Sequence, residues 1–244
     1  MSIFFCCFSI TFKSSRCFIL AFVYKRKEKI WIHAQQLEIR WWKRYLANKN
    51  PTQYHAWKTS YWLRILKSIE HLLPENADSA LDVACGPAGI FLVLHDKQVT
   101  AVDPLIADYE KYSFLKVADY PNVHFETLAF EDFVSNKMYP LVFAMNAINH
   151  FKDIDKAVKK LIQLTATNGR LILSIDTHRI KLLKYLLRWI KIDRMHPWQF
   201  SADEYRNMFQ GNGMELKHES VINSGLVFQH RLMVFSKNKT ITTP

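Results

Sequence analysis

Cysteine is scarce and unevenly placed in this chain. Only four of the 244 residues are cysteines, and Cys6, Cys7 and Cys17 fall within the first 17 positions. The fourth, Cys85, stands beside a glycine in the middle of the chain. No C-x-x-C pair and no Cys/His spacing typical of a metal site occurs, so the sequence excludes a disulfide framework and predicts no metal. This cysteine usage fits a reducing, cytoplasmic compartment.

No apolar run reaches the length of about 18 residues that a membrane-spanning helix needs. Two apolar runs near the N-terminus, Ile3–Phe12 and Cys17–Tyr24, are interrupted by Lys13 and Arg16. No basic residue precedes the first run and no small-residue cleavage site is evident, so the segment is a poor match to a secretory signal peptide. Three interpretations of residues 1–29 stay open: a membrane-surface anchor, a marginal span with its basic end inside, or a gene start placed upstream of a native start near Ile30.

Positive charge is concentrated in the first third of the chain. Residues 1–67 hold 13 lysines and arginines against two glutamates, while the rest of the chain holds 20 charges of each sign. The formal net charge of +11 therefore belongs to the N-terminal extension alone. Such an extension is typical of contact with an anionic membrane surface or a nucleic acid, or of solvated helix faces.

The segment Ala80–Ile90 is the most informative part of the chain. It reads as a buried strand that carries Asp82, followed by a turn of small residues with Gly86 and Gly89. Glycine lets a backbone turn sharply and lets a ligand approach the main chain. The spacing is not the dinucleotide fingerprint G-x-G-x-x-G, and no Gly-Lys-Ser/Thr of a P-loop follows. A strand, a turn and a helix start are predicted here, with a ligand at the carboxyl end of the strand.

This segment resembles the first motif of the class I S-adenosylmethionine-dependent methyltransferases, a hydrophobic strand followed by D-x-G-C-G-x-G. Ala84 stands in place of the first glycine of that motif, and the last glycine is Gly89. The similarity extends from about Leu72 to Lys237 and is strongest to enzymes of small-molecule and quinone biosynthesis. It implies a Rossmann-like, doubly wound α/β fold with a seven-stranded, mostly parallel sheet, one antiparallel strand and N-terminal helices.

The resemblance also implies S-adenosyl-L-methionine as the cofactor and places its binding residues. Asp103 directly follows the apolar strand Val99–Val102 and is expected to bind the ribose. A carboxylate about 20 positions after the turn can accept hydrogen bonds from both ribose hydroxyls. A loop near Phe130 is expected to cover the adenine. The predicted cofactor-binding residues are Asp82, Ala84, Cys85, Gly86, Gly89, Asp103, Pro104, Ala129, Phe130, Glu131 and Asn146.

Further elements follow from periodicity and capping signals. Helical patterns cover Trp31–Leu46 and Pro51–Leu73, with Asn50 as the cap of the second. A helix from Asp153 to Thr165 is expected to stop at Asn168-Gly169. The domains predicted are an N-terminal segment 1–29, a helical cap 30–73, and a cofactor-binding domain 74–238 that contains a lid near 177–200. Within the lid, Arg179–Ile192 reads as a basic amphipathic helix suited to a membrane interface or an apolar acceptor.

Methyl transfer needs a general base only where the acceptor must lose a proton. The candidates are His150, His178 and His196, with Asp176 as a further option. Asn146-Ala147 follows the fourth strand where methyltransferases acting on base amino groups carry Asn/Asp-Pro-Pro-Tyr/Phe, which disfavours a nucleic-acid acceptor. The predicted acceptor is a small apolar or amphipathic molecule. The alternative is a methyltransferase-like fold that binds without catalysis, such as a membrane-tethered scaffold; the oligomeric state is not predicted.

Overall fold

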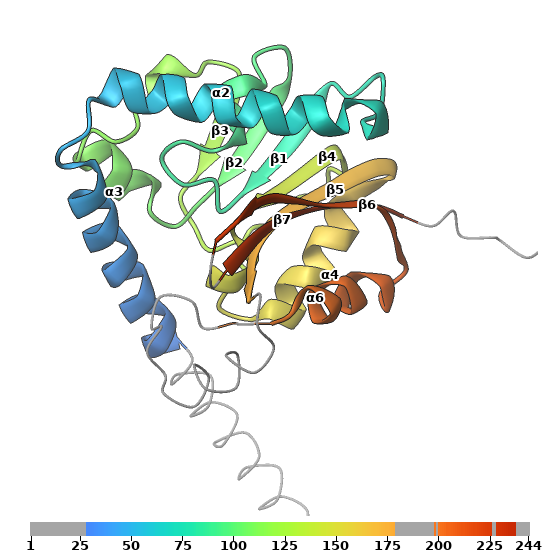
Figure 1. Cartoon of the computed structure of the whole chain (residues 1–244). Helices are drawn as coiled ribbons and strands as arrows, with labels where there is room; N and C mark the ends of the chain where they lie inside the picture. The colour runs from blue at the N-terminus through green and yellow to red at the C-terminus, as the bar shows by residue number, and fades with distance from the viewer. Residues whose placement is uncertain (1–27, 179–197, 199, 226–227, 238–244) are drawn as a thin grey trace, which may run out of the picture.

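The computed structural model describes residues 28–178, 198, 200–225 and 228–237. A single mixed sheet of seven strands forms the centre of the molecule, in the order β3-β2-β1-β4-β5-β7-β6 (Figure 1). The strands are β1 Ser79–Val83, β2 Gln98–Val102, β3 Val123–Glu126, β4 Tyr139–Met145, β5 Thr165–His178, β6 Met214–Ser224 and β7 Phe228–Lys237. Strands β1 to β5 pair in parallel, and β7 is antiparallel to both β5 and β6. The predicted fold class is confirmed.

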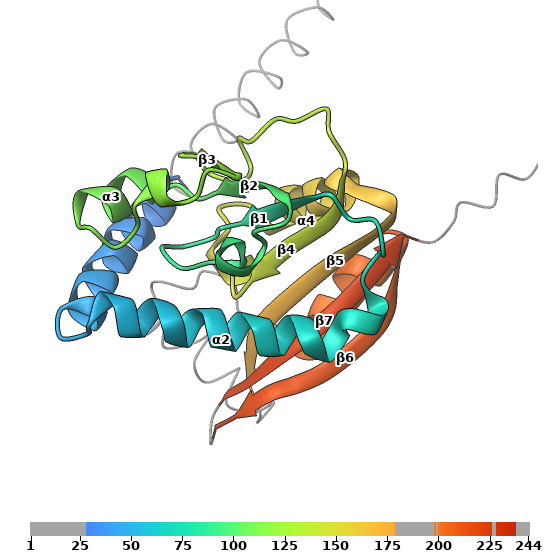
Figure 2. The same cartoon turned by 90° about the horizontal axis from the view of Figure 1, so that it is seen from above.

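Helices cover both faces of the sheet (Figure 2). The first helix described spans residues 28–46. The other helices are α2 Pro51–Ile69, α3 Ile106–Lys111, α4 Ile154–Leu164 and α6 Ala202–Gln210, with short 3-10 turns at Glu70–Leu72, Ile90–Val93, Val117–Asp119 and Ile148–His150. Helix α2 packs on one face of the sheet, and α4 and α6 pack on the other. Two hydrophobic cores result, one on each side of the strands.

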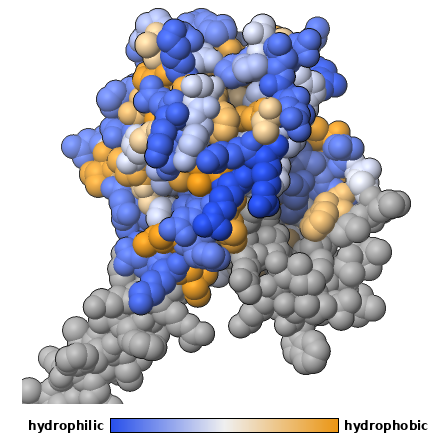
Figure 3. Space-filling model, turned by 90° about the vertical axis from the view of Figure 1, so that its left-hand side faces the viewer, coloured by the Kyte–Doolittle hydropathy of each residue, from blue (hydrophilic) through white to orange (hydrophobic). Residues whose placement is uncertain are grey.

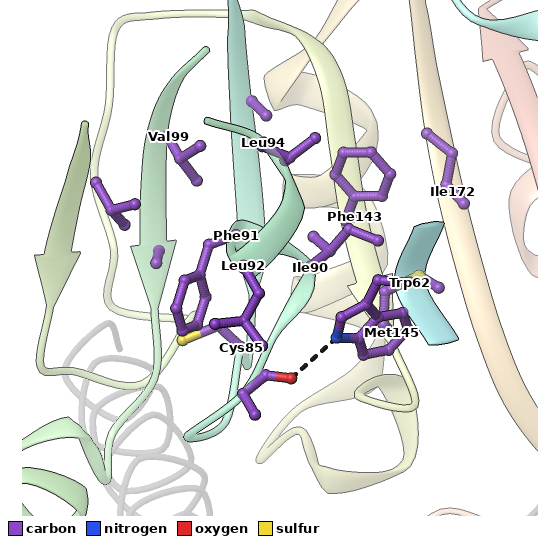
Figure 4. Packing of buried hydrophobic residues seen from close by; sticks show 14 of the residues in the cluster. Trp62, Cys85, Ile90, Phe91, Leu92, Leu94, Val99, Phe143, Met145 and Ile172 are labelled. Carbon is purple, nitrogen blue, oxygen red and sulfur yellow. Dashed lines mark hydrogen bonds between the residues drawn. The ribbon is translucent and has the colours of Figure 1, made fainter. Parts of the chain in front are cut away.

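The parallel strands are buried on both faces, so they read as continuous apolar runs. All five residues of β1 are buried. Alternate residues of β5 point to opposite cores: Ile172 joins the core under α2, while Leu171 and Leu173 join the core under α4 and α6. Figure 4 shows Phe143 of β4 beside Ile90, with Ile172 on the neighbouring strand β5; all three belong to the core under α2. This alternation decides which side chains of β5 face α2.

Helix α2 begins as the sequence predicts. The Asn50 side chain accepts a hydrogen bond from the Gln53 N–H, and Pro51 occupies the first turn. The helical period predicts an apolar stripe at Tyr54, Trp57, Tyr61, Ile65, Ile69 and Leu72. Tyr54, Ile65 and Ile69 are buried as expected, but Trp62 is buried in place of Trp57 and Tyr61. Trp57 is 52% exposed, and Trp62 only 5%. The indole N–H of Trp62 donates to the Ala88 carbonyl at 3.0 Å, which ties α2 to the turn after β1 (Figure 4).

We expect Trp62→Phe to lower the free energy of unfolding by about 1–3 kcal/mol, because it leaves the buried Ala88 carbonyl without its donor. Chemical denaturation followed by circular dichroism measures this change. Trp57→Phe is the matched control on the same helix, and it should change stability by no more than about 0.5 kcal/mol, as an exposed substitution does. Equal stability of the two variants would show that the hydrogen bond contributes nothing.

Two expected element boundaries are wrong. Asn168-Gly169 does not end a helix: α4 ends at Leu164, and β5 begins at Thr165. A Cβ on Gly169 would lie 2.8 Å from the Pro140 carbonyl oxygen, so this glycine permits close approach to β4, where the strand register shifts. The helix expected after Gly89 is only the 3-10 turn Ile90–Val93.

The sequence Ser201-Ala202-Asp203-Glu204 predicts a capped helix start, and the structure confirms it at α6. The Ser201 hydroxyl accepts from the Glu204 N–H, and the Glu204 carboxylate accepts from the Ser201 N–H. The predicted lid helix Arg179–Ile192 and residues 1–27 lie outside the described residues. In the part of the chain that the structure describes, no helix is both long and apolar enough to cross a bilayer.

Candidate functional site

A cavity of about 580 Å³ opens where the carboxyl ends of β1, β2, β4 and β5 meet the two N-terminal helices. Open α/β sheets hold their ligands at this edge, where strand order reverses between β1 and β4. Helix 28–46 and α2 supply aromatic walls: Trp31, Trp41, Trp42, Trp57, Tyr61 and Trp62. The predicted helical cap therefore forms one side of the cavity.

The Asp82 side chain holds the turn that follows β1. This buried carboxylate accepts a hydrogen bond from the Phe91 N–H at 3.2 Å, and burial raises the pKa of Asp82 to about 7. A Cβ on Gly89 would lie 2.5 Å from both Asp82 Oδ2 and the Cys85 carbonyl oxygen. Neither Asp82 nor Gly89 is among the residues that line the cavity. Asp82 and Gly89 therefore shape the turn from the side away from the cavity, and their contact with the cofactor stays a prediction.

Gly86 is the glycine that faces the cavity. Its φ of +62° is a conformation that favours glycine, and a Cβ there would meet only Trp42, at 3.9 Å. Its N–H donates to Asp103 Oδ2 at 2.9 Å, so the turn and the end of β2 are joined directly. The main chain at Gly86 therefore borders the cavity without a side chain in between, so a ligand can approach it closely.

Asp103 lines the cavity next to Gly86. Its Oδ1 accepts from the Leu105 N–H at 2.8 Å, so each carboxylate oxygen holds one backbone donor. Each oxygen keeps a further lone pair for a ligand hydroxyl. Burial, and then the negative charge of Glu38, raise the pKa of Asp103 to about 7. The two backbone donors therefore fix the orientation of the carboxylate. Because of the raised pKa, its charge changes near neutral pH.

The other predicted cofactor residues gather around this end. They line the same cavity: Ala84, Cys85, Pro104, Ala129, Phe130, Glu131 and Asn146. Ala84 (φ +50°) and Asn146 (φ +55°) both have left-handed backbone conformations. Burial raises the pKa of the Cys85 thiol well above its ordinary value, which argues against a nucleophilic role. The Glu131 carboxylate accepts from the Asp153 N–H at 2.9 Å and so also supports the start of α4.

Comparison with known proteins identifies the family. A family model described as "Methyltransferase domain" matches residues 54–219, most of the chain. The chain belongs to this methyltransferase family. The predicted resemblance to class I S-adenosylmethionine-dependent methyltransferases is confirmed, and with it the expected cofactor. The residues at the Gly86–Asp103 end fit that cofactor, because an open glycine turn and a fixed carboxylate stand side by side.

Curated relatives of this chain are distant. Two proteins named ubiquinone biosynthesis O-methyltransferase are 25% identical over 56% of this chain (Rickettsia canadensis) and 26% identical over 64% of it (Rickettsia prowazekii). The aligned region spans 62% and 65% of those relatives' lengths. Magnesium protoporphyrin IX methyltransferase from Synechocystis, solved with bound SAH, shares the fold with a TM-score of 0.61 at 16% identity, over 87% of this chain and 99% of its own.

Of the three predicted bases, only His150 has its side chain among the described residues. His150 lines the cavity; its Nδ1 lies 3.4 Å from Glu38 Oε2, and its carbonyl accepts from the Trp31 indole N–H at 3.1 Å. His178 is the last residue of β5, but its side chain lies outside the described residues, and so does all of His196. Catalytic roles for these three histidines remain predictions.

Two polar side chains that the sequence did not single out also line the cavity. The Lys58 ammonium of α2 lies 4.1 Å from the ring centre of Trp62 and 5.4 Å from that of Tyr61. Burial lowers the pKa of Lys58 to about 8, against the opposite pull of Asp82. His230 of β7 makes a 2.8 Å contact from its Nδ1 to Asp176 Oδ1 on β5. Lys58 and His230 reach the cavity because of how α2 and β7 pack in the fold, which the local sequence does not reveal.

The basic residues of the first helix do not gather at the cavity. Lys29, Arg40, Lys43 and Arg44 are exposed, and the face that carries this helix and α3 is mostly hydrophilic with scattered apolar residues (Figure 3). The arrangement favours the interpretation of solvated helix faces for these four charges. No group of three metal-binding side chains occurs among the described residues.

Proposed function

We propose that this protein transfers a methyl group from S-adenosylmethionine to the hydroxyl of a small acceptor with an apolar body. One observation carries the proposal: a single cavity joins the Gly86–Asp103 turn to the aromatic walls of the two N-terminal helices and to polar groups of β5 and β7. The first part suits the nucleoside of the cofactor, and the second suits an acceptor. A shared cavity brings two reactants together, which is the main contribution a protein makes to such a displacement.

The chain's own residues have distinct roles at the cofactor end. Asp103 accepts from the ribose hydroxyls, the Gly86 turn approaches the cofactor through its main chain, and Phe130 provides an apolar face for the adenine. The cofactor, when bound, supplies a methyl group on a positively charged sulfur. Aromatic walls exclude water from that charge and strengthen electrostatic interactions within the cavity.

The chemical class of the acceptor is inferred from the aromatic walls of the cavity and from the relatives. Large aromatic side chains favour a planar or apolar molecule, because such rings bury much apolar surface. The Rickettsia proteins are named O-methyltransferases, which supports a hydroxyl as the acceptor group. A methyltransferase-like protein that binds without catalysis is the alternative. The polar groups at the acceptor end favour catalysis, since a pure binder has no need of a base.

Incubation with S-adenosylmethionine carrying a deuterated methyl group tests the proposal. The acceptors are catechol, 4-octylcatechol and the matched amine 4-octylaniline, with the products identified by mass spectrometry. We expect transfer to the catechols, faster for the octyl compound, and none to the aniline. Cofactor binding without transfer to any of the three would support the non-catalytic alternative, and transfer to the amine alone would overturn the hydroxyl assignment.

A further inference from the structure

We propose that His230, oriented by Asp176, is the general base that removes the proton from the acceptor hydroxyl. This inference rests on the function proposed above and deepens it, because it assigns the proton transfer to one side chain. Neither residue belongs to the turn or to the strand ends that hold the cofactor. The pair lies at the acceptor end of the same cavity.

The pair is built into the sheet. Asp176 and His230 are directly opposite in the antiparallel pairing of β5 with β7, so their side chains project from the same face. Residues two and four positions along these strands, Ile172, Leu232 and Val234, belong to the core under α2, which identifies that face. The imidazole thus stands on rigid strands, and its side chain is only 16% exposed. A catalytic group needs a fixed support of this kind.

The carboxylate decides which ring nitrogen carries the proton. Asp176 Oδ1 lies 2.8 Å from His230 Nδ1. An ionised carboxylate only accepts hydrogen bonds, so Nδ1 carries the hydrogen and Nε2 keeps its lone pair. A neutral histidine in this tautomer is a base at Nε2, and the carboxylate stabilises the imidazolium that forms when it takes a proton.

Other groups around the acceptor are less suited to the same task. Burial raises the pKa of Tyr61 to about 12, with a further contribution from Asp176, so this phenol stays protonated and can donate to the acceptor. Lys58 carries a proton below about pH 8. His150 faces Glu38, in the neighbourhood of Asp103, which belongs to the cofactor end of the cavity. A carboxylate in general is a weaker base than an imidazole.

The step balances as follows. His230 Nε2 takes the proton of the acceptor hydroxyl, and the oxygen forms a bond to the methyl carbon. The carbon–sulfur bond breaks, and its electron pair stays on sulfur, which loses its positive charge. The imidazolium beside Asp176 then returns the proton to solvent. No oxidant or reductant is needed.

His230→Gln tests the assignment with two catechols that differ in acidity. Methylation of catechol, whose hydroxyl is un-ionised at about pH 8, should fall by roughly 100- to 10,000-fold, the usual contribution of a general base. Methylation of 4-nitrocatechol, already ionised at that pH, should fall less than about tenfold, because no base is required. His218→Gln on the neighbouring strand β6 is the matched control and should keep both activities.

A binding readout keeps the test independent of turnover. The absorption band of 4-nitrocatechol moves to longer wavelength when it ionises. At about pH 6, near the ordinary pKa of histidine, we expect the compound bound with S-adenosylhomocysteine to show the ionised band in the wild type and the un-ionised band in His230→Gln. Asp176→Asn should give an intermediate result.

Identical spectra in the wild type and His230→Gln would overturn the proposal, as would an absence of 4-nitrocatechol binding or an equal loss of activity towards both catechols. Calorimetry with S-adenosylhomocysteine separates this failure from that of the proposed function. A protein that binds the cofactor product but leaves bound nitrocatechol un-ionised refutes only the base. A protein that binds no cofactor product refutes the proposed function itself.

Discussion

Gly89→Ala should lower the free energy of unfolding by about 3 kcal/mol or more and abolish measurable binding of S-adenosylhomocysteine. The added Cβ would lie 2.5 Å from both Asp82 Oδ2 and the Cys85 carbonyl oxygen. Overpacking of a rigid site costs about 1–3 kcal/mol. A displaced Asp82 also loses its hydrogen bond from the Phe91 N–H, and a lost bond to a charged group adds about 1.5–3 kcal/mol.

The structure offers a matched control for this substitution. Gly225 is exposed, and a Cβ there would meet only the Phe228 carbonyl oxygen, at 3.4 Å. Gly225→Ala should therefore change stability by less than about 0.5 kcal/mol and leave cofactor binding intact. Urea denaturation and calorimetry measure the two effects. If Gly89→Ala folds and binds as Gly225→Ala does, the close packing behind the turn is not what holds the site.

Asp103→Ala should weaken S-adenosylhomocysteine binding by about 1–3 kcal/mol, the scale of hydrogen bonds to a charged group. The substitution removes the only carboxylate that both lines the cavity and accepts from the Gly86 N–H, among the residues described. Calorimetry measures the loss. Asp96→Ala, at an exposed carboxylate paired with Lys97, is the control and should bind as the wild type does.

The pH dependence of binding follows from the same carboxylate. Burial and Glu38 raise the pKa of Asp103 to about 7 in the ligand-free protein, and ribose hydroxyls donate best to the ionised form. The affinity should therefore be constant above pH 7 and fall below it, by at most about tenfold per pH unit. Asp103→Asn should remove this dependence. A wild-type affinity that stays flat from pH 5 to pH 8 would show that the ionised Asp103 is not needed.

The parts of the fold that the sequence predicted depend on local chemistry. Asp82, Gly86 and Asp103 lie within one strand–turn–strand unit, so their spacing alone shows that they meet at the same sheet edge. Asn50 and Ser201 cap their helices through hydrogen bonds to residues three positions away. Such signals need no knowledge of the rest of the molecule.

The parts that the sequence missed depend on contacts between distant segments. His230 and Asp176 are 54 positions apart and meet only because β7 pairs with β5. The buried face of α2 includes Trp62, whose indole N–H bonds to the Ala88 carbonyl, whereas the helical period places Trp57 and Tyr61 on that face. Asn168-Gly169 predicts a helix stop, but the close approach of the β4 backbone is what requires a glycine at position 169.

Titration of the purified wild-type chain with S-adenosylhomocysteine by calorimetry tests the central claim most directly. That claim is that the cavity between Gly86, Asp103 and the N-terminal helices is a cofactor site. We expect saturable binding of one molecule per chain, weakened in Asp103→Ala and unchanged in Asp96→Ala. An absence of saturable binding by the folded wild-type protein, or equal affinity of Asp103→Ala and the wild type, would contradict it.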